Sequence, residues 1–327
     1  MRELTFTEAA REGLAEEMER DPMVFVVGEG IGARGGNFAT TVGLFDRFGP
    51  ERLRDTPIAE RGFTGLCTGA ALGGARPVVD YMFFDFALDA LGEIINQTSK
   101  IQYMSDGRLR MPIVLRGCVG IGSSAATHHS GSYYSLFAHI PGLRVVAPTT
   151  PRDAKGLLKT AIRSDDPVVF MEHRSVLSLK GPVPDIDADE LIPFGVAVVR
   201  RPGKDVTIVG IANAVTLAVS AAEALAAEGV DAEVIDPRSL APLDIDCVLA
   251  SIAKTGRLLV VDEDYAPCGV GAEIAAQVAD LGFNDLDAPI RRLNTRHAPI
   301  PYSPPLEQAL VPTEASIVEA VRKLMAE

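Results

Sequence analysis

Cysteine is scarce in this sequence. The four cysteines, Cys67, Cys118, Cys247 and Cys268, lie far apart and form no C-x-x-C pair. Structural zinc sites and redox dithiols are usually built on such closely spaced pairs, so neither is expected. Each cysteine is more simply interpreted as a small residue of a buried core.

Long apolar runs and basic clusters are also missing. No apolar run approaches the roughly 20 residues that span a bilayer, so we expect no membrane contact. Acidic residues outnumber basic ones by 44 to 31, and the net charge of −13 would repel phosphate backbones, which argues against nucleic-acid binding. The start, Met1-Arg-Glu-Leu-Thr-Phe-Thr-Glu, resembles neither a signal nor a transit peptide. We therefore expect a cytoplasmic protein.

The size and the order of the patterns predict two α/β domains. A chain of 327 residues exceeds the ~250–300 residues at which single cores stop growing. The stretch Lys180-Gly-Pro-Val-Pro-Asp-Ile-Asp-Ala-Asp-Glu190 is rich in proline and acids and lacks periodicity, which is typical of a linker. We place the boundary near residue 187, between a domain of residues 1–187 and a domain of residues 188–327.

Short apolar runs alternate with longer helical patterns in both halves, which indicates parallel sheets covered by helices. The expected strands are Met23–Val27, Pro77–Met82, Pro112–Arg116, Leu143–Ala147, Pro167–Glu172, Val206–Ile211, Ala232–Ile235, Arg257–Val261 and Pro289–Leu293. The expected helices are Thr7–Arg20, Gly62–Gly74, Asp85–Met104, Asp153–Arg163, Ala214–Ala227, Ile245–Ala253, Gly269–Leu281 and Ser316–Met325.

Two segments are rich in glycine. Gly28-Glu-Gly-Ile-Gly-Ala33 formally fits a dinucleotide fingerprint, but Arg34-Gly-Gly-Asn37 would break the helix that the fingerprint requires, so a loop is the better interpretation. The expected helix Gly62–Gly74 contains several glycines, each costing about 1 kcal/mol relative to alanine. Small side chains permit close approach, so we expect this helix to pack tightly against a neighbour.

Three further segments carry side chains suited to a site. Asp55-Thr-Pro-Ile-Ala-Glu60 delivers a carboxylate to a helix start, where a capping acid is the simpler interpretation. The aromatic run Tyr81–Phe86 lies where a strand meets a helix and could belong to the core. Ser123-Ser-Ala-Ala-Thr-His128-His129-Ser130-Gly131 follows a strand and fits acid–base or substrate-binding roles, although the histidines could also be exposed without function. Its serines form no G-x-S-x-G elbow.

A series of segments, in order along nearly the whole chain, resembles one family. They match the β subunit of thiamine-diphosphate-dependent 2-oxoacid dehydrogenases, of the pyruvate, branched-chain and acetoin dehydrogenase type in the transketolase-like superfamily. The matching segments are Asp55–Glu60, Arg76-Pro-Val-Val-Asp-Tyr-Met-Phe-Phe-Asp-Phe86, His129-Ser130, Phe137–Val146, Asp153–Leu158, Val234–Asp244, Asp262-Glu-Asp264 and Pro299–Glu307.

The resemblance implies a thiamine diphosphate pyrimidine-binding domain followed by a transketolase C-terminal-like domain. It implies that Glu60 holds the aminopyrimidine ring, that Phe86 and Met82 pack on the ring face, and that Ile58 lies in the same edge segment. His129 is implied to bind the substrate carboxylate or to assist lipoyl acylation, and Glu29 to join an acidic proton relay. The sequence indicates no metal ligands of its own.

The resemblance also implies partners. The Gly-Asp-Gly motif with a following Asn, which holds Mg²⁺ and the diphosphate in this superfamily, is missing from the sequence. An α subunit should therefore supply that half of the site, typically in an α₂β₂ heterotetramer. The expected reaction is decarboxylation of a 2-oxoacid, pyruvate first, with transfer of the acyl group to lipoamide on an acyltransferase core.

The histidine segment departs from the family. Relatives usually show Gln-His-Ser-Gln, whereas this chain has His128-His129-Ser130-Gly131. The departure leaves branched-chain 2-oxoacids and acetoin open as substrates. A structural K⁺ near Ile113, Ala161 and Ile162 is also left open, because Ser164 stands where relatives have an acid. The chain could also be half of a split transketolase-like enzyme or a non-catalytic assembly subunit, although the presence of both Glu60 and His129 argues against a non-catalytic role.

Overall fold

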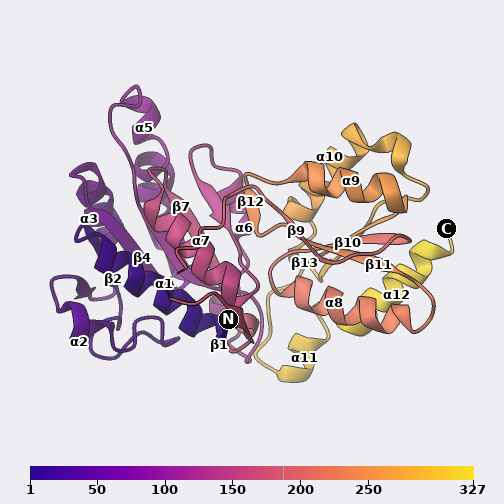
Figure 1. Ribbon diagram of the computed structural model, residues 1–327, viewed down its shortest axis with the longest axis horizontal. Helices are drawn as coiled ribbons and strands as arrows, with labels where there is room; N and C mark the ends of the chain where they lie inside the picture. The colour runs from indigo at the N-terminus through magenta and orange to yellow at the C-terminus, as the bar shows by residue number, and fades with distance from the viewer. Residues whose placement is uncertain (187) are drawn as a thin grey trace. The chain divides into compact units, whose positions relative to one another are not determined.

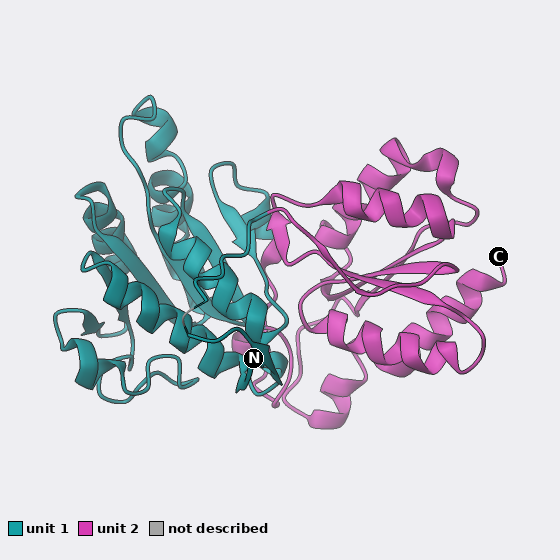
Figure 2. Ribbon diagram, in the orientation of Figure 1, with its two compact units in different colours: residues 1–119, 136–194 teal, residues 120–135, 195–327 magenta. Residues whose placement is uncertain are grey.

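The computed structural model describes residues 1–186 and 188–327. The chain forms two compact units that are not continuous in sequence (Figure 2). The first comprises Met1–Val119 and Leu136–Phe194, and the second comprises Gly120–Ser135 and Gly195–Glu327. The predicted boundary, residue 187, lies outside the described residues. Segment Gly120–Ser135 lies between two parts of the first unit in sequence, yet it packs with the second.

The first unit is built on a parallel sheet. Six of its strands follow the order β6-β7-β5-β4-β2-β3, and all their pairings are parallel. Burial on both faces explains why these strands are continuous apolar runs. The strands are β2 (Val24–Gly28), β3 (Leu53–Asp55), β4 (Arg76–Phe83), β5 (Val114–Val119), β6 (Arg144–Val146) and β7 (Val168–His173).

Helices α1 (Phe6–Arg20) and α7 (Pro151–Arg163) lie side by side in the first unit (Figure 1). Thr5 and Glu8 form a capping box at the start of α1, and Thr150 caps α7 ahead of Pro151. Apolar residues of both helices join those of the sheet in one buried cluster. The other helices of the unit are α2 (Leu44–Phe48), α3 (Glu60–Leu72), α4 (Leu91–Glu93), α5 (Ile101–Met104), α6 (Tyr134–Ala138, whose first two residues belong to the second unit), and the single turns η1 (Phe84–Ala90), η2 (Ile94–Thr98) and η4 (Arg174–Val176).

Two predictions about this unit are wrong. The predicted helix Asp85–Met104 is a broken series in which a 3₁₀ segment, a short α-helix and a π turn follow one another. Gly92 and the β-branched pair Ile94 and Ile95 weaken a continuous α-helix there. The predicted linker begins with a strand, β8 (Lys180–Val183), which pairs antiparallel with β1 (Arg2–Thr5) and buries Val183 completely.

The second unit has its own five-stranded sheet in the order β14-β13-β10-β11-β9, parallel except for β9. Helices α8 and α12 cover one face and α9 and α10 the other (Figure 1). The elements are β9 (Val198–Arg201), β10 (Val206–Gly210), β11 (Ala232–Asp236), β12 (Ser239–Ala241), β13 (Leu258–Tyr265), β14 (Arg291–Thr295), α8 (Asn213–Ala226), α9 (Ile245–Thr255), α10 (Val270–Leu281), α11 (Pro304–Gln308), α12 (Glu314–Met325), η3 (Thr127–His129) and η5 (Phe283–Asp285).

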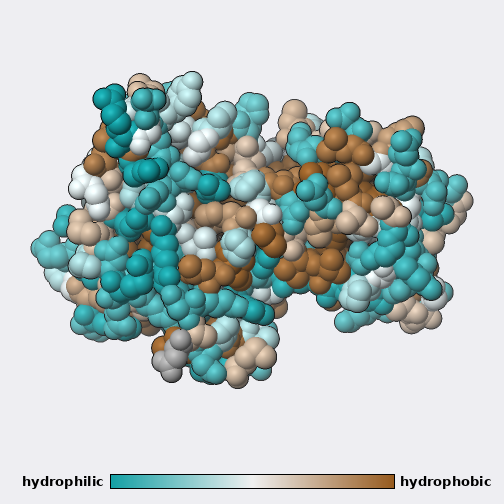
Figure 3. Space-filling model, turned by 45° about the horizontal axis from the view of Figure 1, so that its top comes forward, coloured by the Kyte–Doolittle hydropathy of each residue, from teal (hydrophilic) through white to brown (hydrophobic). Residues whose placement is uncertain are grey.

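The molecular surface mixes polar and apolar side chains. Figure 3 shows polar side chains spread over one face of the molecule and interrupted by smaller apolar patches. Within residues 1–186 and 188–327, no helix combines the length and the apolar character needed to cross a bilayer.

The cysteines are all free: Cys67 and Cys118 are buried as expected, whereas Cys268 is exposed, because it lies in the turn after β13 rather than in a core.

Candidate active site

The carboxyl ends of strands β2 and β3 bring two glutamates together in the first unit. Glu29 follows β2 directly, and Glu60 is the first residue of α3, five residues after the end of β3. The backbone N–H of Thr56 donates to the carbonyl of Gly28 at 3.0 Å, which ties the two strand ends together. Ligand sites of open parallel sheets lie at this edge.

Glu29 and Glu60 form a carboxyl pair. Glu60 is only 7% exposed, and its side chain lies within hydrogen-bond reach of that of Glu29. Burial, and then the neighbouring charge of Glu60, raise the pKa of Glu29 above its usual range. The charge of Glu60 therefore makes ionisation of Glu29 less favourable.

Glu60 is the first residue of α3 and not its N-cap, which is Ala59. An acid in the first turn can pair with the helix dipole from the surface, whereas Glu60 is buried beside a second acid, an arrangement that dipole pairing does not require. The Oε1 atom of Glu29 is buried and has no hydrogen-bond donor among the described residues, so a ligand donor could satisfy it.

The other predicted cofactor residues lie on neighbouring segments of the first unit. Ile58 is 82% exposed, two residues before Glu60, and so is available to a group outside this chain. Phe86 is half-buried in η1, with its ring edge-on to Phe83 at 6.0 Å between centroids. Met82 is half-buried and accepts a hydrogen bond on its sulfur from the Asn37 amide.

Strand β4 is distorted at Met82. The register between β4 and β5 shifts between Asp80 and Phe83, and Met82 has a φ of +65°. A non-glycine residue in this region costs on the order of 1–3 kcal/mol and persists only where the surroundings impose it. Buried Asp80 does so by accepting the Met82 backbone N–H at 2.9 Å and the Thr40 hydroxyl at 3.0 Å. The bulge turns Met82 out of the regular pleat.

Sequence reasoning missed Arg174. Its guanidinium lies over the ring of Phe83, 5.0 Å from the centroid, directly after β7. The signal in the sequence was a lone basic residue at the carboxyl end of an apolar strand. Cys118, at the end of β5, is not a candidate nucleophile, because burial raises the pKa of its thiol to about 12 and keeps it neutral.

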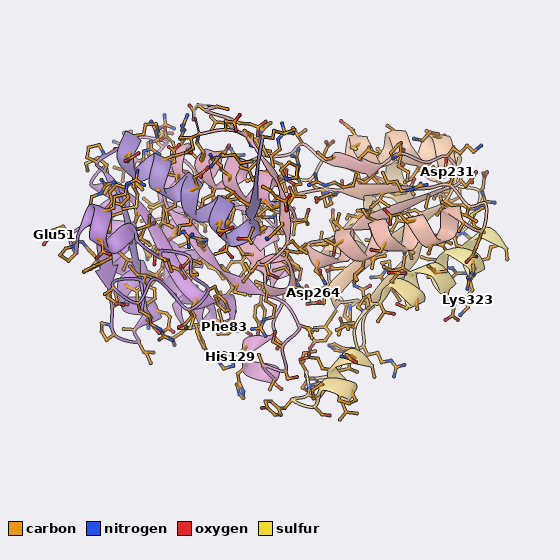
Figure 4. All side chains as sticks on the ribbon, turned by 60° about the horizontal axis from the view of Figure 1, so that its bottom comes forward. Glu51, Phe83, His129, Asp231, Asp264 and Lys323 are labelled. Carbon is orange, nitrogen blue, oxygen red and sulfur yellow. The ribbon has the colours of Figure 1, made fainter. Side chains whose placement is uncertain are left out.

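His129 lies in the second unit. It is half-buried in the single turn η3, within the segment Gly120–Ser135, and Figure 4 shows it together with Asp264 at the end of β13. Three non-glycine residues of this segment, Ser123, Ser124 and Ala126, have φ between +52° and +62°. So dense a run of left-handed residues marks a segment whose shape is imposed by its contacts.

Three consecutive buried acids end strand β13. Asp262 is completely buried and Glu263 and Asp264 are each 8% exposed. Burial and the neighbouring Asp264 raise the pKa of Asp262 to about 8, and burial raises the pKa of Asp264 to about 6. The sequence showed this triplet as part of the family resemblance, but no role was predicted for it.

Metal-binding geometry is not evident in the described part of the chain. No group of three or more His, Cys, Asp or Glu side chains among residues 1–186 and 188–327 is arranged to hold a metal ion. Of the carbonyl groups considered for K⁺, that of Ile162 accepts a hydrogen bond from Arg76 Nη1 at 3.0 Å. The carbonyl of Ser164 accepts one from the same atom at 2.9 Å.

Comparison with known proteins identifies two domain families in the chain. The family "Transketolase, pyrimidine binding domain" matches residues 2–180, and "Transketolase, C-terminal domain" matches residues 195–317. The pyruvate dehydrogenase E1 component subunit beta of Rickettsia felis is 44% identical over 322 residues, covering 98% of both chains. An acetoin:2,6-dichlorophenolindophenol oxidoreductase subunit beta of Cupriavidus necator is 44% identical over 334 residues, covering 99% of this chain and 98% of its own.

The chain belongs to the β-subunit family of thiamine-diphosphate-dependent 2-oxoacid dehydrogenases. The first unit contains most of the residues matched to the pyrimidine-binding domain, including Glu29 and Glu60. Among solved structures, a split-gene transketolase described as an inactive beta4 tetramer has a TM-score of 0.78 at 23% identity, covering 99% of this chain and 98% of its own. That similarity establishes the shared fold of this β-subunit family and the transketolases.

Proposed function

We propose that this chain is the β subunit of a 2-oxoacid dehydrogenase that decarboxylates pyruvate and passes the acyl group to lipoamide on an acyltransferase core. The observation that carries the proposal is the pairing of buried Glu60 with half-buried Glu29 at the sheet edge of a pyrimidine-binding domain. Thiamine diphosphate, when bound, supplies the electron sink that lets the bond between carboxylate and 2-oxo carbon break.

The residues of this chain fit the aminopyrimidine half of that cofactor. Glu60 would hold a ring nitrogen through a hydrogen bond, and its exchange of a proton with the ring would be supported by Glu29. Burial favours this role, because a hydrogen bond from Glu60 to the ring would be shielded from competing water. Phe86 and Met82 would pack on the ring face, and Ile58 would border it. The orphaned Glu29 Oε1 is consistent with a ligand donor at this edge.

His129 would act on the substrate side. An imidazole side chain can bind a carboxylate or move a proton to an acceptor. We assign it the substrate carboxylate or the acylation of the lipoyl group. The diphosphate and Mg²⁺ would be held mainly by an α subunit, because the Gly-Asp-Gly motif is missing from this sequence.

The glycine-rich face of α3 supports a partner chain. A Cβ added at Gly69 would meet nothing within 4 Å, and one at Gly65 would meet only the Glu93 carboxyl, at 3.7 Å and beyond. Leu66, between them, is 55% exposed. No described residue packs closely over α3 at Gly69, and we propose that another subunit of an α₂β₂ heterotetramer packs there.

Reconstitution with the α subunit tests the proposal. The chain alone should be inactive, and mixing with α, thiamine diphosphate and Mg²⁺ should give pyruvate-dependent CO₂ release and lipoyl acylation. Glu60→Gln should lower both by about 100-fold or more, the range for a positioned proton-transfer group. The matched control is Glu51→Gln, an exposed glutamate of the same unit, which should retain full activity. Robust turnover by the isolated chain, or an active Glu60→Gln enzyme, would contradict the proposal.

Acetoin is the second candidate substrate, because the Cupriavidus necator relative is as similar as the pyruvate dehydrogenase subunits. The His128-His129-Ser130-Gly131 departure also falls in the segment assigned to the substrate. A panel of pyruvate, branched-chain 2-oxoacids and acetoin at equal concentration decides between them. Acetoin cleavage without release of CO₂ would replace the pyruvate assignment, and turnover of sugar phosphates without lipoyl dependence would indicate a split transketolase.

A further inference from the structure

The segment that carries His129 is attached at both ends to consecutive acids of strand β13. Near its start, the backbone N–H of Ile121 donates to the Glu263 carboxylate. At its end, the Ser135 hydroxyl donates to Asp264 Oδ2 at 3.2 Å. Both acids are largely buried, so these hydrogen bonds are shielded from water and are worth more than surface contacts.

The middle of the segment is attached to the region around α11. The Thr127 hydroxyl donates to the carbonyl of Ile300 at 2.8 Å, two residues from His129. The backbone N–H of Ser124 lies 3.4 Å from Oε1 of Glu307, which is itself buried. Within the segment, the Gly120 N–H donates to the carbonyl of Gly131 at 3.0 Å and closes the loop at its base.

These contacts explain how a strained conformation is maintained. Ser123, Ser124 and Ala126 all have a positive φ, in the left-handed region. In a free loop of this composition, these residues would adopt unstrained backbone angles instead. The attachments are therefore what fixes the direction in which His129 leaves the backbone. Asp264 is in turn oriented by its neighbours, because its carbonyl accepts the Asn294 amide at 2.9 Å and its Oδ1 accepts the Tyr265 N–H at 2.7 Å.

We propose that Glu263 and Asp264 are positioning residues for His129, through which the C-terminal domain holds the substrate-side histidine in its working orientation. The proposal rests on the function assigned above to His129. It gives a task in the reaction to two acids that lie outside the pyrimidine-binding unit. The same two side chains accept from opposite ends of the segment, so the loss of either should release it.

Hydrogen exchange on the full chain measures the attachment directly. Glu263→Ala should speed amide exchange over residues 120–135 by about tenfold, as expected when a hydrogen bond to a charged acceptor is removed. Glu263→Gln keeps a carbonyl oxygen for the Ile121 N–H and should restore slow exchange. Thr127→Val removes a donor from the segment itself and serves if Glu263→Ala does not fold. The control is Glu273→Ala, an exposed acid of the same unit.

Activity of the reconstituted holoenzyme separates positioning from mere packing. In Glu263→Ala, or in Thr127→Val, lipoyl acylation should fall by about tenfold, whereas exchange of the cofactor's C2 hydrogen with solvent, which depends on Glu60, should stay within about twofold of wild type. Glu263→Gln should recover most of the acylation rate. This split would not arise from a general loss of folded protein, which would lower both rates equally.

Two results would overturn the proposal. One is slow exchange over residues 120–135 in Glu263→Ala and Thr127→Val alike. The other is fast exchange with unchanged acylation, which would make the attachment purely structural. If the wild-type holoenzyme acylates no lipoyl domain with any 2-oxoacid, the proposed function fails instead. The positioning role for His129 would then fail with it, and exchange over residues 120–135 would still show whether Glu263 attaches the segment.

Discussion

At the scale of single residues, the site combines two glutamates that are 31 positions apart in sequence. Each was predicted from its own segment, but their contact was not, because it depends on the parallel pairing of β2 with β3. Strand pairing over such a separation leaves no local signal in either segment. Arg174 was missed for the same reason, since its neighbour Phe83 belongs to a different strand end.

The pair predicts a pH-dependent effect of Glu29→Gln. The pKa of Glu29 is raised in the folded protein, so its favourable contribution to stability is complete below the unfolded pKa and is lost as pH rises through the folded one. Glutamine cannot ionise. The variant should therefore resist urea better than wild type at pH 8 and differ little at pH 4.5. An equal difference in the unfolding midpoint at both pH values would contradict the raised pKa.

The raised pKa of Asp262 predicts a larger pH-dependent change in stability than that of Glu29, extending to higher pH. Its pKa rises from 3.8 to about 8 on folding, so the stability that it contributes below pH ~4 is lost progressively as pH approaches 8. Asp262→Asn keeps Oδ1 for the Asp264 N–H and removes the charge. At pH 9 the variant should be more stable by ~2 kcal/mol or more, with a much smaller difference at pH 5. Urea unfolding of both proteins at the two pH values checks this.

At the scale of elements, the strands were predicted well because their apolar runs are continuous and bounded by turn residues. The edge strand β3 and the separate two-stranded sheet of β1 and β8 were not predicted, because these strands are short and carry polar residues. The helix predicted over Asp85–Met104 was wrong, since its apolar spacing allowed one helix while Gly92 and local backbone contacts favoured several turns. Tertiary packing decides such cases, and the sequence window alone does not contain it.

The ion pair across β5 and β7 predicts a strongly non-additive mutant cycle. Arg116 and Glu172 are 1% and 3% exposed and are joined by two hydrogen bonds of 2.7 and 2.9 Å. Arg116→Met would leave Glu172 without its ion-pair partner in the core and should cost about 3–5 kcal/mol. Adding Glu172→Met should recover much of that loss. Equal and additive losses, measured by urea unfolding of the four proteins, would show that the pair is not coupled.

At the scale of the whole molecule, the open face of α3 predicts that assembly and folding can be separated. Gly69→Leu places a side chain where this chain has space and replaces a poor helix former, so the isolated subunit should be as stable as wild type or more stable by up to about 1 kcal/mol. The same side chain should block the approach of a partner and prevent formation of the α₂β₂ complex.

Size-exclusion chromatography with light scattering, together with thermal unfolding of the isolated subunit, measures both parts. The control is Ala226→Leu, which enlarges an exposed position of α8 and should leave assembly unchanged. A Gly69→Leu subunit that assembles normally would place the partner on another face.

Two α/β domains were predictable from alternation alone, but the assignment of Gly120–Ser135 to the second unit was not, because its anchors lie more than 120 residues downstream.

That discontinuity matters for anyone who wishes to recombine this protein with its relatives. The chain passes into the second unit at Gly120, returns after Ser135 and crosses again at Gly195. A chimera joined only near residue 190 would combine residues 120–135 of one parent, which carry the histidine, with the three acids at the end of β13 from the other parent. Exchanging residues 120–135 together with 195–327 takes the histidine segment and the acids that attach it from the same parent. Chimeras in this fold should therefore exchange both pieces together.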